Sequence, residues 1–237
     1  MMSTARLPVP KMPPRTIFIT GSDTGAGKTV LTACLLHYLL RSGRDVLAMK
    51  PFCSGSRADV DLLQAVQGSR LPDEQMNPFY FADPVAPLVA ARQARRKILL
   101  SEVLRKIRRV ERQCKCLLIE GSGGLLVPLG EGYTVADLIK RLRCTVLVVA
   151  RNRLGTINHT LLTVRALGLR GPERIKVVLR DEAEPDISAR TNLEILAETL
   201  APIEVLPLPF FGPRAARLEA IKKNAKKVKN IVASVFD

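Results

Sequence analysis

The sequence predicts a single-domain α/β fold with a doubly wound, mostly parallel sheet, and three observations support this. Short apolar runs alternate with helical segments from Thr16 onward, which is typical of parallel strands joined by right-handed crossovers. Aromatic residues make up only 4% of the chain and Trp is absent, a balance that suits buried strands rich in Val, Ile and Leu. A glycine-rich segment, GSDTGAGKT at 21–29, lies between the first apolar run and an amphipathic stretch.

The elements are predicted from apolar runs of strand length and from helical periodicity. The expected strands are Thr16–Thr20, Val46–Lys50, Cys116–Glu120, Thr145–Ala150, Ile175–Leu179 and Ile203–Leu206, with a further candidate near Phe79–Phe81. A helix after GSDTGAGKT is predicted by the i, i+3, i+4, i+7, i+8 spacing of Leu31, Cys34, Leu35, Tyr38 and Leu39, and Gly43 is expected to end it. Thr134 and Asp137 form a capping-box pair before a second helix, which is predicted by Val135, Leu138, Ile139 and Leu142.

The domain is expected to span residues 15–237, preceded by a disordered tail at 1–14. That tail is proline-rich and lacks the apolar stretch of a secretory signal. No run of about 18 uncharged apolar residues occurs, so no membrane span is expected. Five cysteines at irregular spacing indicate a reducing compartment, here the cytoplasm.

The formal net charge is +15, with basic runs at 92–97 (RQARRK), 105–109 (RKIRR) and 222–227 (KKNAKK). No aromatic residues are interleaved with these runs and no nucleic-acid signature accompanies them. Solvated helix faces are therefore favoured over a nucleic-acid interface. A cationic surface would also attract anionic substrates such as nucleotides.

The segment GSDTGAGKT has the chemistry of the phosphate loop of P-loop NTPases. Its glycines let backbone N–H groups surround an oxyanion, Lys28 adds a positive charge, and Thr29 can bind magnesium. A strict P-loop has glycine where this chain has Ser22, so the loop is one residue longer. Its place between a strand and a helix favours nucleotide binding over a structural turn, but does not decide between chemistry and switching.

Three more polar clusters follow apolar runs: KPFCSG at 50–55, EGSGG at 120–124 and RLGTINH at 153–159. In doubly wound sheets the ligand lies beyond the carboxyl ends of the strands, where such clusters meet. Lys50 is placed to stabilise charge on a moving phosphoryl group. Asp59, Asp61 and Glu120 supply the carboxylates that magnesium needs.

Together these motifs resemble the dethiobiotin synthetase family. The family's loop has the form GTDTxVGKT, with the same extra residue as GSDTGAGKT. The other motifs follow in the family's order: KPFCSG, DVDLLQ (59–64), NPFYFADPVAPLVAA (77–91), EGSGGLLVP (120–128) and LGTINH (154–159). The ordered match runs from about Thr16 to about Leu167, and six motifs in one order are far more specific than any one of them.

The resemblance implies a homodimeric, magnesium- and ATP-dependent cyclo-ligase of biotin biosynthesis. It would convert 7,8-diaminononanoate (diaminopelargonate) and CO2 into dethiobiotin, through a carbamate and a carbamic-phosphoric anhydride. By position, the resemblance makes Lys28, Lys50 and Thr24 catalytic. It makes the magnesium ligands Thr29, Asp59 and Glu120. It assigns nucleotide contacts to Gly25, Ala26, Gly27, Lys28, Thr29, Val30, Arg180 and Pro209. It assigns substrate contacts to Ser54, Gly123, Gly155, Thr156, Ile157 and Asn158, the last four reaching across the dimer interface.

Two positions depart from the family's pattern. Leu88 stands where the family often has histidine, and Arg180 stands where it commonly has an asparagine that binds adenine. Arg180 therefore predicts a looser or altered nucleotide preference, with a pyrimidine triphosphate as an alternative to ATP.

Three other functions remain as alternatives. A partition-type switch ATPase commonly carries a lysine at the position of Asp23 and has no need of LGTINH, so both features argue against it. A basic nucleic-acid-binding ATPase predicts binding that falls steeply with salt. An amide-forming ligase with its own ammonia supply would need a glutamine-hydrolysing domain, which the chain lacks.

Overall fold

The computed structural model describes residues 15–168 and 174–236. Within them a parallel sheet forms the centre, in the order β10-β9-β8-β1-β5-β2. Its strands are β1 (Thr16–Gly21), β2 (Val46–Met49), β5 (Cys116–Glu120), β8 (Thr145–Arg151), β9 (Arg174–Arg180) and β10 (Glu204–Leu208). The predicted doubly wound fold is confirmed. The predicted tail at 1–14 lies outside the described residues.

The central strands are buried on both faces. Every residue of β1, β2 and β5 is buried, as expected for strands of a parallel sheet covered by helices on both sides. In register, Ile19 of β1 lies beside Glu120 of β5 and beside Leu147 of β8. This register brings the end of β1, and the loop that follows it, to the middle of the carboxyl edge.

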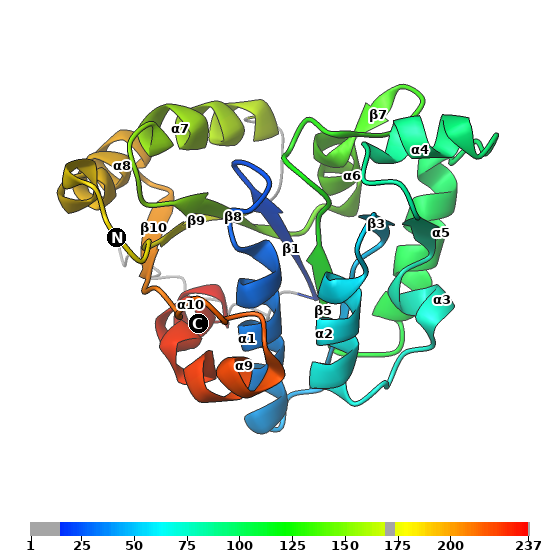
Figure 1. The fold of residues 1–237 in the computed structure, drawn as a ribbon, viewed down its shortest axis with the longest axis horizontal. Helices are drawn as coiled ribbons and strands as arrows, with labels where there is room; N and C mark the ends of the chain where they lie inside the picture. Colours follow the sequence, from blue (N-terminus) through cyan, green and yellow to red (C-terminus); the bar gives the residue numbers. More distant parts are fainter. Residues whose placement is uncertain (1–14, 169–173, 237) are drawn as a thin grey trace, which may run out of the picture.

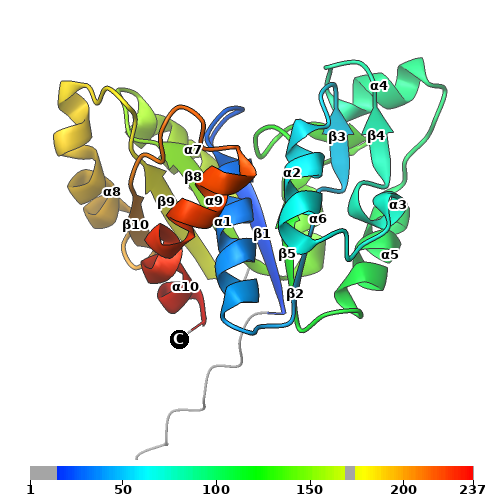
Figure 2. The same ribbon diagram turned by 60° about the horizontal axis from the view of Figure 1, so that its bottom comes forward.

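Helices cover the two faces of the sheet, as Figures 1 and 2 show. One layer contains α1 (Lys28–Arg41), α2 (Ala58–Gln67), α9 (Leu218–Asn224), the short helix η2 (Ala225–Val228) and α10 (Lys229–Phe236). The other contains α5 (Leu100–Glu111), α6 (Val135–Leu142), α7 (Thr156–Leu167) and α8 (Asn192–Leu200). Helix α1 packs against the central strands of the sheet, so the glycine-rich loop joins the central strand β1 to the helix that covers it.

Smaller elements extend the carboxyl edge beside β2. Strands β3 (Phe52–Ser54) and β4 (Phe79–Phe81) pair in parallel, and the Phe52 and Phe79 rings stack with centroids 4.8 Å apart. The others on this side are α3 (Asp73–Met76), α4 (Pro87–Gln93), β6 (Pro128–Gly130) and β7 (Tyr133–Thr134), whereas η1 (Ile187–Arg190) packs against α8 near the opposite edge of the sheet. The predicted candidate strand at Phe79–Phe81 is confirmed, whereas its partner β3 was not predicted.

The helix signals in the sequence are confirmed. Gly43 has φ +72° and follows the last turn of α1, and the capping box between Thr134 and Asp137 is formed in both directions. Five of the seven predicted strands have limits that differ from the structure by one or two residues. Strand β2 ends before Lys50, because the Lys50 N–H donates to the Met76 carbonyl at 3.0 Å. Strand β10 continues through Pro207, because an edge strand tolerates a residue without N–H.

Among the described residues, none of the helices has the length and apolar character needed to cross a membrane.

Candidate active site

The glycine-rich loop links β1 to α1 and surrounds a space at the helix N-terminus. Gly25 and Gly27 have φ angles of +74° and +101°, a region that side-chain-bearing residues rarely adopt. Gly27 is the N-cap of α1, without a side-chain cap or an acidic residue in the first turn. The free N–H groups and the helix dipole therefore favour an anion here.

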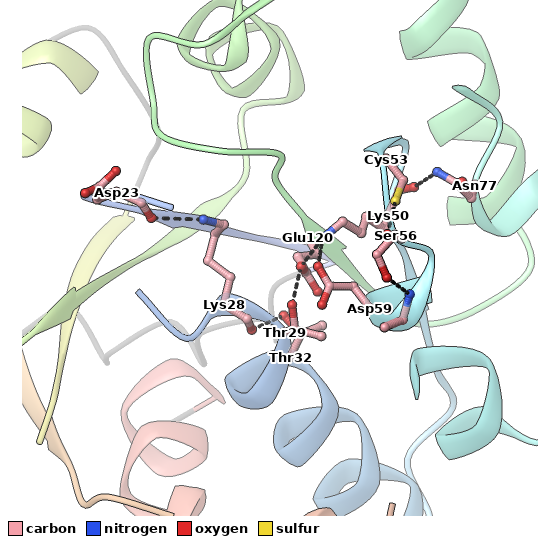
Figure 3. Close-up of polar contacts among 11 residues, drawn as sticks. Asp23, Lys28, Thr29, Thr32, Lys50, Cys53, Ser56, Asp59, Asn77 and Glu120 are labelled. Carbon is pink, nitrogen blue, oxygen red and sulfur yellow. Dashed lines mark hydrogen bonds and ion pairs between the residues drawn. The ribbon is translucent and has the colours of Figure 1, made fainter. Parts of the chain in front are cut away.

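Lys28 points back along this loop. Its Nζ donates to the Asp23 carbonyl at 3.1 Å, as drawn in Figure 3, and the residue is 7% exposed. Burial lowers the pKa of Lys28, and the nearby Lys50 ammonium lowers it further, whereas the carboxylates of Glu120 and Asp59 oppose this. An ammonium that is poorly solvated and bound to a single carbonyl is well suited to pair with a phosphate.

Four side chains meet beside the loop, from α1, α2, β5 and the segment that follows β2 (Figure 3). Lys50 Nζ lies 2.6 Å from Glu120 Oε1 and also pairs with Asp59. Thr29 Oγ1 donates to the same Glu120 oxygen at 2.7 Å. Burial opposes the charge on Lys50, but Glu120 and Asp59 outweigh it and raise the pKa of the lysine. Lys50 is therefore held as a cation at the carboxyl edge.

This cluster also has the oxygen donors that a magnesium ion needs. Glu120 is fully buried, and its Oε2 atom has no hydrogen-bond partner. Asp59 and the Thr29 hydroxyl supply further oxygens, and magnesium commonly takes one or two carboxylates together with phosphate and water. Within 15–168 and 174–236, no cluster of three or more His, Cys, Asp or Glu residues is arranged for a metal. The two carboxylates and the hydroxyl are a donor set that magnesium can take when nucleotide phosphates and water supply its other ligands.

These groups surround a cavity of about 360 Å³. The predicted residues that line it are Thr24, Gly25, Gly27, Lys28, Thr29, Val30, Lys50, Ser54, Asp59, Glu120 and Gly123. Ala26 is fully buried within the loop. Cys53, Ser56, Ser122 and Ala216 also line the cavity but were not predicted. Ser54 Oγ is buried without a partner, which leaves a hydroxyl available to a substrate.

Arg180 lies on the other side of the phosphate loop, at the end of β9. Its Nε donates to the Ala26 carbonyl at 3.1 Å and its Nη2 to Glu182 at 2.8 Å. Burial lowers the pKa of Arg180, and the Glu182 carboxylate opposes that effect. Pro209 is exposed directly after β10, next to Phe210. Phe210 and Glu182 line a second cavity of about 610 Å³.

The predicted residues Gly155 to Asn158 do not line either cavity. They form the N-terminus of α7, where Gly155 is the N-cap with φ +88° and no side chain caps the helix. Thr156 is 4% exposed and its hydroxyl has no partner. A third cavity, of about 440 Å³, lies between the 124–128 segment and α7 and includes Thr24 and Leu162.

Sequence reasoning missed Glu182 and Arg151, which pair at 2.6 Å. Strand register places Arg151 of β8 beside Arg180 of β9, and Glu182 pairs with both arginines. The signal was present in the sequence as an acid two residues after Arg180. That this acid pairs with both arginines depends on the register between β8 and β9, which the sequence does not specify.

Comparison with known proteins gives a consistent result. Residues 15–207 match the family model described as an AAA domain. The ATP-dependent dethiobiotin synthetase of Anaeromyxobacter sp. (strain Fw109-5) is 44% identical over 176 residues, which are 73% of this chain and 79% of that relative. The enzyme of the same name from Bacillus subtilis (strain 168) is 38% identical over 198 residues, 81% of this chain and 85% of that relative.

Solved structures with a similar fold include a ParA family ATPase from Chlorobium tepidum TLS. It is 13% identical, with a TM-score of 0.51 over 90% of this chain and 98% of that chain. The pNOB8 ParA structure bound to nonspecific DNA is 15% identical, with a TM-score of 0.54 over 92% and 98%. At such low identity these similarities show the fold alone.

Proposed function

This chain belongs to the dethiobiotin synthetase family, and from that premise we propose how its cavity carries out the family's reaction. The protein is an ATP-dependent cyclo-ligase of biotin biosynthesis. Its substrates are diaminopelargonate, CO2 and ATP. The observation that carries the proposal is the meeting of Lys28, Lys50, Thr29 and Glu120 at one phosphate loop.

The reaction has three steps that balance without any further reactant. One substrate amine attacks CO2 and loses a proton, which forms a carbamate. A carbamate oxygen then attacks the γ-phosphorus of ATP and ADP leaves, which forms the carbamic-phosphoric anhydride. The second amine attacks the carbonyl carbon and loses a proton to solvent, the C–O bond to phosphate breaks, and phosphate leaves as the cyclic urea closes.

The residues around the cavity supply position and charge. Lys28, with Thr24 on the same loop, contacts the phosphates, and Lys50 lies where the carbamate meets the γ-phosphoryl group. Phosphoryl transfer depends mainly on such positioning, which can be worth about 7–11 kcal/mol. A strong general base is not required for the phosphoryl transfer, because the carbamate oxygen that attacks phosphorus is already an anion.

Magnesium completes this arrangement when the nucleotide is bound. Thr29, Asp59 and Glu120 would hold it, and the unpartnered Oε2 atom of Glu120 supports this assignment. The ion would neutralise charge on the phosphate oxygens during transfer. Lys50 pairs with both carboxylates, with Glu120 in the buried part of the site and with Asp59 at its more exposed side.

The diamine would contact Ser54 and Gly123 in the cavity, and its carboxylate would be held at the N-terminus of α7, by Gly155 to Asn158. Because these four residues line neither the phosphate cavity nor the cavity beyond Arg180 in one chain, they would serve a partner's cavity in a homodimer. Exposed leucines near this helix support such an interface: Leu126, Leu154 and Leu162, at 65%, 80% and 56% exposure.

The protein would act in the cytoplasm. Its five cysteines are free thiols, and burial raises the pKa of Cys34, Cys116 and Cys144 to about 12. Such thiols are poor nucleophiles and suit a reducing compartment.

Phosphate release with omission of each substrate tests the proposal. Release should require nucleotide, diaminopelargonate and bicarbonate together. Lys50→Met should lower the rate by at least about 100-fold, because the transferring phosphoryl group loses a fixed cation. The matched exchange Lys140→Met, on the exposed surface of α6, should leave it unchanged. Release that continues without the diamine would refute the proposed function.

A further inference from the structure

Arg180 forms one wall of the phosphate loop. A Cβ built on Gly27 would lie 2.9 Å from Arg180 Cδ, and the arginine side chain is 15% exposed. Lys50, Asp59 and Glu120 lie in the same cavity as the loop and are the groups suited to a terminal phosphate. The sugar and base of a bound nucleotide must therefore leave the loop at the end where Gly27 and Arg180 meet.

A cavity large enough for those groups begins at Glu182, which accepts a hydrogen bond from Arg180. It measures about 610 Å³ and is lined by Asn152, Asp181, Glu182, Pro185, Asp186, Ile187, Ala189, Arg190 and Phe210. Phe210, Ile187 and Pro185 offer apolar surface against which a base can stack. Arg180 lies close to Gly27 on one side and donates to Glu182 on the other, so it lies between the glycine-rich loop and this cavity.

Arg180 is part of an ion-pair cluster with Glu182 and Arg151. Glu182 accepts from Arg151 Nε at 2.6 Å and Nη2 at 3.0 Å, and from Arg180 Nη2 at 2.8 Å. One carboxylate is thus shared by two guanidiniums, which leaves the cluster with net positive charge. A guanidinium has five N–H groups and no acceptor, and Arg180 directs one to Ala26 and one to Glu182. Its other N–H groups make no hydrogen bond within the described residues.

We propose that Arg180, held by Glu182 and Arg151, makes the base site accept nucleoside triphosphates that carry a carbonyl oxygen at least as well as ATP. A carbonyl oxygen of hypoxanthine, guanine, uracil or cytosine can accept from a guanidinium. The exocyclic amino group of adenine is itself a donor, so adenine can accept from Arg180 only at its ring nitrogens, whereas guanine and hypoxanthine can accept at both O6 and N7. The inference rests on the proposed function only in that a nucleotide occupies the phosphate loop.

ATP and ITP form a matched pair for the test, because they differ at the 6-position of the purine and in the protonation of N1. Equilibrium titration of the full chain with each nucleotide and magnesium gives the ratio of the two dissociation constants, ITP over ATP. We expect a ratio at or below about 1 for the unchanged protein. In Arg180→Gln a side-chain carbonyl can accept from the adenine amino group, so the ratio should rise about two- to tenfold. The same exchange at Arg108, exposed on α5, should leave the ratio unchanged.

The outcomes separate the two proposals. ATP binding tighter than ITP beyond the error of the titration in the unchanged protein would overturn the inference and assign base recognition to an acceptor such as Asp181. Equal ratios in the Arg180→Gln and Arg108→Gln proteins would overturn it as well. If the ratios behave as expected but phosphate release does not depend on the diamine, the proposed function fails while the inference stands. If the protein binds only ATP and its phosphate release depends on the diamine, the inference fails while the proposed function stands.

Discussion

Replacing Glu120 with glutamine should destabilise the protein through Lys50. Glu120 is fully buried and its Oε1 atom lies 2.6 Å from Lys50 Nζ. At that distance and an effective dielectric constant of about 20, the attraction between unit charges is about 6 kcal/mol. Asp59, whose side chain is 46% exposed, would remain as a partial partner for the lysine. We therefore expect the free energy of unfolding to fall by about 3 kcal/mol, near the lower limit for breaking a buried pair.

A double-mutant cycle makes this prediction specific to the pair. Lys50→Met alone leaves the Glu120 carboxylate buried without a cation, whereas Lys50→Met combined with Glu120→Gln removes both charges. Because each single change leaves an uncompensated charge, the double variant should be more stable than the sum of the single effects predicts, by about 2–3 kcal/mol.

Urea unfolding followed by circular dichroism at pH 7 measures these free energies. The ion pair between Arg92 and Glu131 is the control, because its side chains are 63% and 48% exposed at a similar distance of 2.7 Å. Its own cycle should show a coupling within the error of the measurement. A coupling between Lys50 and Glu120 no larger than that of the exposed pair would refute the reasoning.

Three further predictions concern the loop, the arginine cluster and the basic surface. Gly27→Ala forces a side chain into φ +101° against Arg180, so it should cost about 1–2 kcal/mol of stability and abolish nucleotide binding in titrations. A variant that binds normally would contradict the role of Gly27. The hydrogen bond from Arg151 lowers the pKa of Glu182, although burial opposes this. The stabilisation from Glu182 is therefore complete above the ordinary carboxyl pKa of 4.5 and is lost as pH falls through the lowered pKa. The stability gap between wild type and Glu182→Gln should close in acid, and a gap that widens there would exclude this linkage. Labelled duplex DNA should dissociate at physiological salt, whereas retention there would favour a nucleic-acid function for the basic surface.

The central part of the fold could be predicted because its signals are local. The strand, glycine-rich loop and helix that carry Lys28 follow from an apolar run, positive-φ glycines and helical periodicity within about 25 residues. Lys50 and Glu120 were expected at one edge because parallel strands end on the same side of the sheet. The structure places Lys50 Nζ 2.6 Å from Glu120 Oε1.

Other features could not be predicted because they depend on pairings between distant segments. Strand β3 has only three residues, and it forms because Phe52 stacks on Phe79. Glu182 becomes part of the site because the register of β8 and β9 sets Arg151 beside Arg180. No local pattern specifies that register, so the sequence could indicate that Arg180 was unusual but not which carboxylate holds it.

Incubation with 13C-bicarbonate, diaminopelargonate and MgATP tests the central claim most directly, with the product analysed by mass spectrometry and NMR. The account predicts one labelled carbon in the carbonyl of a cyclic urea, and one phosphate released for each ring formed. Phosphate release without incorporation of the labelled carbon would contradict it.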